Sequence, residues 1–153
     1  MIKIEITDIK QLNLITKKLI PIIGNKSLIL LDGDLGAGKT TFVKSILQNL
    51  GYNKIVSSPT FNIMNIYEFN NMTVCHCDLY RLKSENELVN ISIEDFIGNS
   101  IVFVEWPDLL IKNTSYDSIN LKFELKTNNK RFIIISTKNK CKLEQLKQTF
   151  HGN

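Results

Sequence analysis

The segment Gly-Asp-Leu-Gly-Ala-Gly-Lys-Thr at residues 33–40 constrains the fold of this chain more than any other feature. A continuous apolar run at 27–31 precedes it, which is typical of a strand buried on both faces. A helical pattern begins inside the segment at Lys39 and stops at Gly51, with its apolar residues on one face. This order of strand, glycine-rich loop and helix favours an α/β domain.

The same segment satisfies the P-loop pattern, which is Gly, four residues, then Gly-Lys-Ser/Thr. Glycines permit positive φ and a close backbone approach, so successive N–H groups can surround an anion. The following helix adds its positive dipole end, Lys39 can reach the β- and γ-phosphates, and the Thr40 hydroxyl can bind Mg²⁺. The predicted phosphate site consists of Gly33, Asp34, Leu35, Gly36, Ala37, Gly38, Lys39 and Thr40.

A P-loop also needs a carboxylate opposite Thr40 to hold the metal or its waters. Two acids lie near strand ends: Asp78 in the alternating run 72–79, and Glu105 in the apolar run 100–106. The second follows the Walker B arrangement, an acid that ends an apolar strand. The sequence leaves open which acid binds the metal and which orients the attacking water. His76 shares a strand face with Asp78, where it could hold that acid, orient a water or simply lie at the surface.

Two further segments are candidates for contacts with a nucleotide. The stretch 57–61 lies between the P-loop helix and a predicted hairpin, and Pro59 stiffens it. A hydroxyl in such a loop can contact a γ-phosphate, as Thr does in switch regions. Trp106, the single Trp, is compatible with core packing, a lid or nucleotide contact.

The remaining pattern predicts one α/β domain over residues 1–153. We expect a single P-loop NTPase domain with a mixed sheet, central parallel strands, antiparallel hairpins and flanking helices. Hairpin turns are predicted at 70–71 and 128–129. Strands are predicted at 1–7, 27–31, 61–69, 72–79, 100–106, 119–126 and 131–137, and helices at 8–23, 39–50 and 140–150, with two short helical turns in 84–98.

Composition narrows the class of protein. A chain of 153 residues with 43% hydrophobic residues can bury one core without disulfides. No apolar run is long enough to span a membrane, and the first residues lack a signal-peptide core, so we expect a cytoplasmic protein.

Three cysteines are an odd number, which favours reduced thiols. Cys75 and Cys77 alternate with His76 and Asp78, so these four cannot close on one zinc ion, and buried thiols are expected.

The net charge of +4 is unevenly distributed. Residues 1–120 carry 11 basic and 13 acidic side chains, whereas residues 121–153 carry 8 and 2. The basic end is compatible with a patch for nucleic acid or a partner, and also with an ordinary solvated face rich in Lys.

Four sequence blocks together resemble a known family. They are GDLGAGKTTF (33–42), SPTF (58–61), HCDLYRL (76–82) and EWP (105–107), in this order. The chain resembles the bacterial tRNA threonylcarbamoyladenosine biosynthesis ATPase family TsaE, formerly YjeE, over residues 6–137. The resemblance implies a weak ATPase that uses ATP and Mg²⁺, releases ADP and works with the TsaB and TsaD proteins. That complex modifies the adenosine beside the anticodon of tRNA, and the ATPase supports the transfer without performing it, so its contact with tRNA is indirect.

The resemblance also implies residue roles. Residues 36–41, including Thr41, would bind the phosphates, and Thr40 with Glu105 would occupy the magnesium positions. Asp78 matches the essential acid, and Thr60 the switch-loop threonine. The catalytic residues would be Lys39, Asp78 and Glu105. Tyr80 and Arg81 would face the partner or the nucleotide. An arginine that the family has in the last hairpin would correspond to Lys130 or Arg131. Ser92 stands where the family usually has Gly, and the positions near the base in the N-terminal helix match poorly.

Two other classes of protein are compatible with a P-loop. A small-molecule kinase for nucleosides or nucleotides would use several lid arginines, but the chain has only Arg81 and Arg131. A regulatory GTPase would carry Asn-Lys-x-Asp, but the Asn-Lys pairs at 25–26, 53–54, 129–130 and 139–140 all lack the Asp. We therefore expect the ATPase, with the kinase as the alternative.

Overall fold

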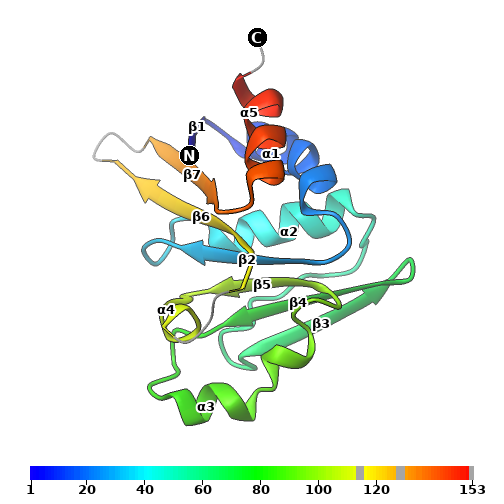
Figure 1. Cartoon of the computed structure of the whole chain (residues 1–153), viewed down its shortest axis with the longest axis vertical. Coiled ribbons are helices and arrows are strands. Elements are labelled where there is room, and N and C mark those ends of the chain that lie inside the picture. The colour runs from blue at the N-terminus through cyan, green and yellow to red at the C-terminus, as the bar shows by residue number, and fades with distance from the viewer. Residues whose placement is uncertain (113–115, 127–129, 152–153) are drawn as a thin grey trace.

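A mixed β-sheet forms the centre of the computed structural model, which describes residues 1–112, 116–126 and 130–151 (Figure 1). The strand order is β1-β7-β6-β2-β5-β4-β3. The central strands β6, β2, β5 and β4 are parallel, and the β3–β4, β6–β7 and β1–β7 pairs are antiparallel. The strands are β1 (Ile2–Ile6), β2 (Ser27–Asp32), β3 (Met64–Phe69), β4 (Met72–Asp78), β5 (Ile101–Glu105), β6 (Ser118–Leu125) and β7 (Arg131–Thr137).

Helices cover the two faces of the sheet. The helical elements are α1 (Ile9–Ile23), α2 (Lys39–Asn49), α3 (Glu85–Asn90), the 3₁₀ turn η1 (Ile93–Asp95), α4 (Asp108–Ile111) and α5 (Lys140–His151). Helix α1 packs beside α2 and α5, and α3 contacts α4 on the part of the molecule near β4 and β5 (Figure 1). The predicted α/β class with a mixed, helix-flanked sheet is therefore confirmed.

Alternation along β2 explains why it is buried on both faces. Ile29 and Leu31 belong to the larger core with Phe42 of α2, whereas Leu28 and Leu30 belong to a second core. All four side chains are buried, as a central parallel strand requires. The two cores fix β2 between neighbours and so fix the loop that follows it.

Most predicted elements are present, with two differences. The first hairpin strand begins at Met64, not at residue 61, because the chain turns at Ile63, whose φ is 65° and whose carbonyl accepts from the Asp78 amide. The short helix α4 was not expected; β5 ends at Glu105, and α4 begins after Pro107, its N-cap residue. The turn predicted at 128–129 lies outside the described residues.

The cysteines of β4 lie as the alternation predicts. Cys75 and Cys77 are fully buried in the second core, with their sulfur atoms 3.6 Å apart. The hydrogen bond with the Cys75 thiol, together with burial, raises the pKa of Cys77 far above its ordinary value. Within the described ranges, no group of three or more His, Cys, Asp or Glu side chains has the arrangement of a metal site. None of the helices described has the length and apolar character that crossing a bilayer needs.

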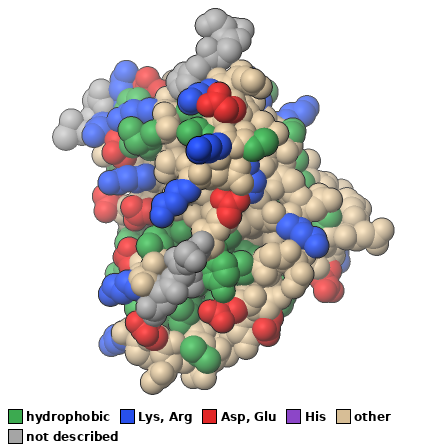
Figure 2. All heavy atoms as spheres, viewed as in Figure 1, with side chains coloured by type: hydrophobic (Ala, Val, Ile, Leu, Met, Phe, Trp, Pro, Cys, Tyr) green, Lys and Arg blue, Asp and Glu red, His purple; other side chains and the backbone are tan. Residues whose placement is uncertain are grey.

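The basic end does not form an unbroken positive surface. Figure 2 shows Lys and Arg side chains interspersed with Asp and Glu over the half of the molecule formed by β6, β7 and α5. Ion pairs join Lys3 and Lys126 to Glu124, Lys130 to Glu5, and Lys147 to Glu144. This mixture is the pattern of a solvated face.

Candidate functional site

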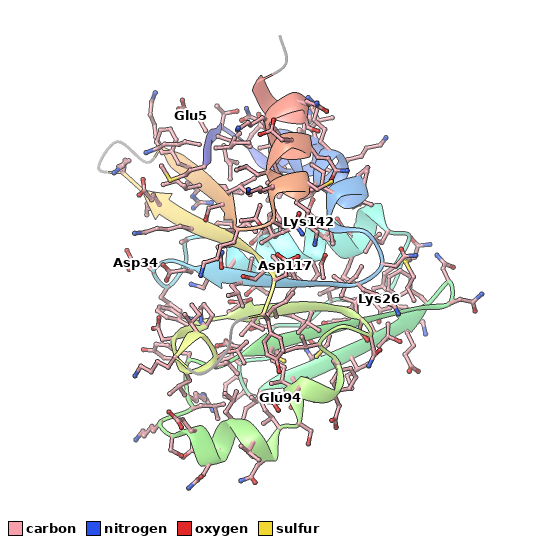
Figure 3. All side chains as sticks on the ribbon, in the orientation of Figure 1. Glu5, Lys26, Asp34, Glu94, Asp117 and Lys142 are labelled. Atoms are coloured by element: carbon pink, nitrogen blue, oxygen red, sulfur yellow. The ribbon has the colours of Figure 1, made fainter. Side chains whose placement is uncertain are left out.

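The glycine-rich loop, residues 33–40, connects β2 to α2 at the end of the parallel strands; Asp34, labelled in Figure 3, marks its position. Gly33, Gly36 and Gly38 all have positive φ, at 140°, 77° and 109°. Gly38 is the left-handed residue at the start of α2. The conformational reason for the glycines, inferred from the sequence, is confirmed, and the loop wraps around the helix N-terminus as an anion site requires.

Lys39 is folded back onto this loop. Its Nζ donates hydrogen bonds to the carbonyl oxygens of Gly33 and Asp34, the second at 3.0 Å, and lies 4.1 Å from the ring centroid of Trp106. Burial lowers the pKa of Lys39, and the nearby carboxylates, with Glu105 the first of them, oppose this shift. Carbonyls, carboxylates and an aromatic face together stabilise a buried ammonium in a position where a phosphate could replace the carbonyls.

Register places the two predicted acids side by side. Glu105 of β5 lies opposite Leu31 of β2 on one side and opposite Asp78 of β4 on the other. Both acids are nearly fully buried at the ends of their strands. Parallel strands that end together therefore bring two carboxylates, separate in sequence, to the mouth of the P-loop.

Glu105 connects the P-loop helix to the neighbouring strand. The Thr40 hydroxyl donates to Glu105 Oε1 at 2.7 Å, and His76 Nε2 lies 2.8 Å from the same oxygen. His76 is fully buried, so the surface position considered from the sequence is wrong. It contacts Glu105 and not Asp78, because the imidazole reaches across to β5.

Asp78 connects the 57–61 loop to the same place. Thr60 Oγ1 donates to Asp78 Oδ2 at 2.7 Å, and the Tyr80 amide donates to Asp78 Oδ1 at 3.0 Å. The hydroxyl groups of Ser58 and Thr60 are 2.7 Å apart. The loop that carries the predicted switch threonine is thus held against one acid, while the P-loop helix is held against the other.

These groups surround one cavity of about 200 Å³, called here the P-loop cavity. It contains most of the predicted site residues, together with the Trp106 ring, for which the sequence left several roles open. Its lining is Leu35, Gly36, Gly38, Lys39, Thr40, Thr41, Ser58, Thr60, Asp78, Glu105 and Trp106.

Arg81 does not line this cavity. Its guanidinium stacks 4.5 Å from the ring centroid of Phe61, on the exposed surface beside the cavity. Tyr80, its neighbour, packs against Trp106 with the ring centroids 4.9 Å apart. The side chains of Leu35, Phe61 and Tyr80 are 83%, 81% and 59% exposed. Apolar groups and one Arg therefore form an exposed rim, which we call the aromatic rim, at the mouth of the P-loop cavity.

A second cavity of about 470 Å³ lies on the other side of the loop, and we call it the α1 cavity. The resemblance had indicated two of its walls, the N-terminal helix and the last hairpin, but not how they meet the loop. Its lining is residues 6–9 and Leu12, then Ala37, Gly38 and Thr41, and Phe123 with Arg131. Of the two basic candidates of that hairpin, Arg131 lines this cavity, whereas Lys130 pairs with Glu5.

The sheet, the glycine-rich loop between β2 and α2 and the acids at the strand ends define a mixed α/β domain with a candidate phosphate site. The chain belongs to the family described as "Threonylcarbamoyl adenosine biosynthesis protein TsaE", whose model matches residues 6–133. This confirms the resemblance carried by the four sequence blocks.

Individual relatives agree with this assignment. The chain is 36% identical over 130 residues to the tRNA threonylcarbamoyladenosine biosynthesis protein TsaE of Rickettsia conorii. This alignment covers 82% of this chain and 74% of that protein. It is 44% identical over 80 residues to the protein of the same name from Bacillus subtilis, about half of each chain. The crystal structure of Bacillus subtilis YdiB has the same fold, with a TM-score of 0.75 and 24% identity over 99% of this chain and 96% of that one.

Proposed function

We propose that this chain is a Mg²⁺-dependent ATPase that supports, and does not perform, the threonylcarbamoyl modification of tRNA. Family membership assigns the chain to threonylcarbamoyladenosine biosynthesis. The observation that carries the finer proposal is the convergence of Lys39, Thr40, Asp78 and Glu105 on the P-loop cavity. A phosphate-binding loop with a buried Lys and two carboxylates is the donor set that a magnesium–nucleotide complex needs.

The contacts favour different roles for the two acids. Glu105 accepts from Thr40, the hydroxyl that binds Mg²⁺ in P-loop proteins, so Glu105 belongs to the metal side of the site. Asp78 accepts from Thr60 on the 57–61 loop, which supports a role in orienting a water for attack on the γ-phosphate. Mg²⁺ held by Thr40 and Glu105 would supply positive charge that offsets the negative charge of the phosphates. Lys39 would exchange the loop carbonyls for phosphate oxygens.

The α1 cavity supports binding of the nucleoside part. It adjoins the P-loop at Ala37, Gly38 and Thr41, and its volume suits a base and ribose. Arg131 is the basic side chain within it. The kinase alternative gains no support, because neither Arg81 on Phe61 nor Arg131 in the α1 cavity lines the P-loop cavity.

The aromatic rim supports dependence on partners. Exposed apolar groups beside a functional cavity are typical of a protein interface. Lys39 is the one basic side chain among the residues that line the P-loop cavity, so little positive charge is available for the transition state. We therefore expect slow hydrolysis by the isolated chain and faster hydrolysis with TsaB and TsaD.

Calorimetric titration with ATP and ADP, with and without Mg²⁺, tests the proposal directly. The wild-type chain should bind both nucleotides, and Lys39→Ala should weaken binding at least tenfold. Pulldown of TsaB and TsaD should depend on the nucleotide. The absence of Mg²⁺–ATP binding by wild type, or full tRNA modification in cells that carry only Lys39→Ala, would contradict it.

A further inference from the structure

His76 is a buried titratable side chain that the proposed function does not use. It lies on β4 with no exposed surface, and its Nδ1 is the one buried side-chain polar atom without a hydrogen-bond partner among the described residues. A buried polar atom without a partner costs free energy. If position 76 only filled space in the core, an apolar side chain would therefore give a more stable fold. Val74, on the same face of the strand, is such a residue.

Among the described residues, the polar partner of the His76 side chain is Glu105. A carboxylate accepts hydrogen bonds, so Nε2 carries the hydrogen in the 2.8 Å contact with Oε1. Thr40 donates to the same Oε1 at 2.7 Å. Both contacts fall on one oxygen, which leaves Oε2 for a ligand in the P-loop cavity that Glu105 lines.

The two donors come from independent elements. Thr40 lies on α2, directly after the glycine loop, whereas His76 lies in the middle of β4 beside β5. Thr40 would bind a metal ion through a lone pair of its hydroxyl oxygen, and a shift of that oxygen toward the ion would lengthen its hydrogen bond to Glu105. The contact with His76 does not depend on that movement, and it holds the carboxylate in the same orientation.

We propose that His76 is a positioning residue, which keeps the Glu105 carboxylate directed into the P-loop cavity when Thr40 is drawn to Mg²⁺. This inference rests on the proposed function. A histidine N–H that holds a ligating carboxylate acts as outer-shell residues do at metal sites, where loss of such a contact typically lowers metal affinity about 10- to 100-fold.

Three variants test this role. His76→Leu fills the space without a donor, His76→Gln keeps an N–H within reach of Glu105, and Val74→Thr perturbs a buried site of the same strand face away from Glu105. ADP affinity is measured by calorimetry with and without Mg²⁺, and stability by urea unfolding. Without Mg²⁺, we expect His76→Leu to bind ADP with an affinity within about twofold of wild type. The factor by which Mg²⁺ raises the ADP affinity should be about tenfold smaller in His76→Leu than in wild type.

The other variants separate positioning from folding. His76→Gln should recover most of the Mg²⁺ effect, and Val74→Thr should lower stability but keep that effect. The inference is overturned if His76→Leu keeps the wild-type Mg²⁺ response, if Gln restores nothing, or if Val74→Thr shows the same loss. If wild type itself binds no nucleotide, both the proposed function and this role of His76 are rejected. If Mg²⁺ raises the ADP affinity of wild type and of His76→Leu equally, only the role of His76 is rejected.

Discussion

Gly33 is the position where a single methyl group would most directly test the geometry of the P-loop. Its φ of 140° is a conformation that side chains rarely adopt. A Cβ at this position would lie 2.6 Å from the carbonyl oxygen of Phe123 and 2.9 Å from its Cβ. Since β6 is a central strand, paired with β2 and β7, this obstacle is backbone that cannot move alone. Gly33→Ala must therefore displace the loop.

The expected loss of stability combines two effects. The unfavourable backbone conformation costs about 1–3 kcal/mol, and forcing an extra methyl group into packed structure costs about 1–3 kcal/mol. Gly33→Ala should then lower the free energy of unfolding by about 2–6 kcal/mol. For a chain of this length the melting temperature should fall by about 5–20 °C.

Gly24→Ala provides the matched control. Gly24 also has positive φ, 65°, at the end of α1, but a Cβ there would meet no atom within 4 Å. Only its backbone conformation, with φ of 65° and ψ of −161°, is penalised, by about 1–3 kcal/mol. Urea unfolding followed by circular dichroism gives both values, and ADP titration shows whether the displaced loop still binds phosphate. Equal losses of stability in the two variants would refute the close approach of the loop to β6.

Three more predictions concern other parts of the molecule. Nucleotide phosphates should draw Lys39 away from the Trp106 ring and change the fluorescence of this single Trp; an unchanged emission at saturating ATP would contradict the exchange of ligands. A thiol reagent should modify Cys141 rapidly in the native protein and the two buried cysteines of β4 only on unfolding, so three fast thiols would contradict their burial. The hydrogen bond from Lys3 lowers the pKa of Glu124 below its ordinary value of 4.5. This contact therefore stabilises the folded protein at pH values above 4.5, and the stabilisation disappears as the pH falls through the lowered pKa. The stability difference between wild type and Glu124→Gln should therefore be present at pH 7 and disappear in acid, and a difference independent of pH would exclude this cause.

Local signals in the sequence predicted most of the fold. The P-loop helix was predicted to start at Lys39, and it does, because the glycines and the apolar spacing act within a few residues. The acid at the end of β5 was predicted from the apolar run before it. Such signals depend on the chain's own neighbours, and no distant contact was needed to find them.

Contacts between segments that are distant in the chain could not be predicted from the sequence. The partner of His76 depends on which strand lies beside β4, and that strand comes about thirty residues later in the chain. The position of the Trp106 ring over Lys39 depends on a left-handed backbone, with φ of 57°, directly after β5. Neither the strand order nor this local conformation leaves a periodic pattern, so both roles stayed open until the geometry was known.

The internal pairing of the site supports the expectation that a metal ion strengthens the binding of an anion. Lys39 is bonded to carbonyls, Thr40 to Glu105 and Thr60 to Asp78, so each group must leave a partner to meet a ligand. Two carboxylates and one ammonium give the lined cavity a net negative charge, which repels a nucleotide that carries several negative charges. A divalent cation held at Thr40 and Glu105 would reverse that charge, and the phosphates could then replace the carbonyls as partners of Lys39. Nucleotide affinity should therefore depend on Mg²⁺ more strongly than the single Thr40 contact would suggest.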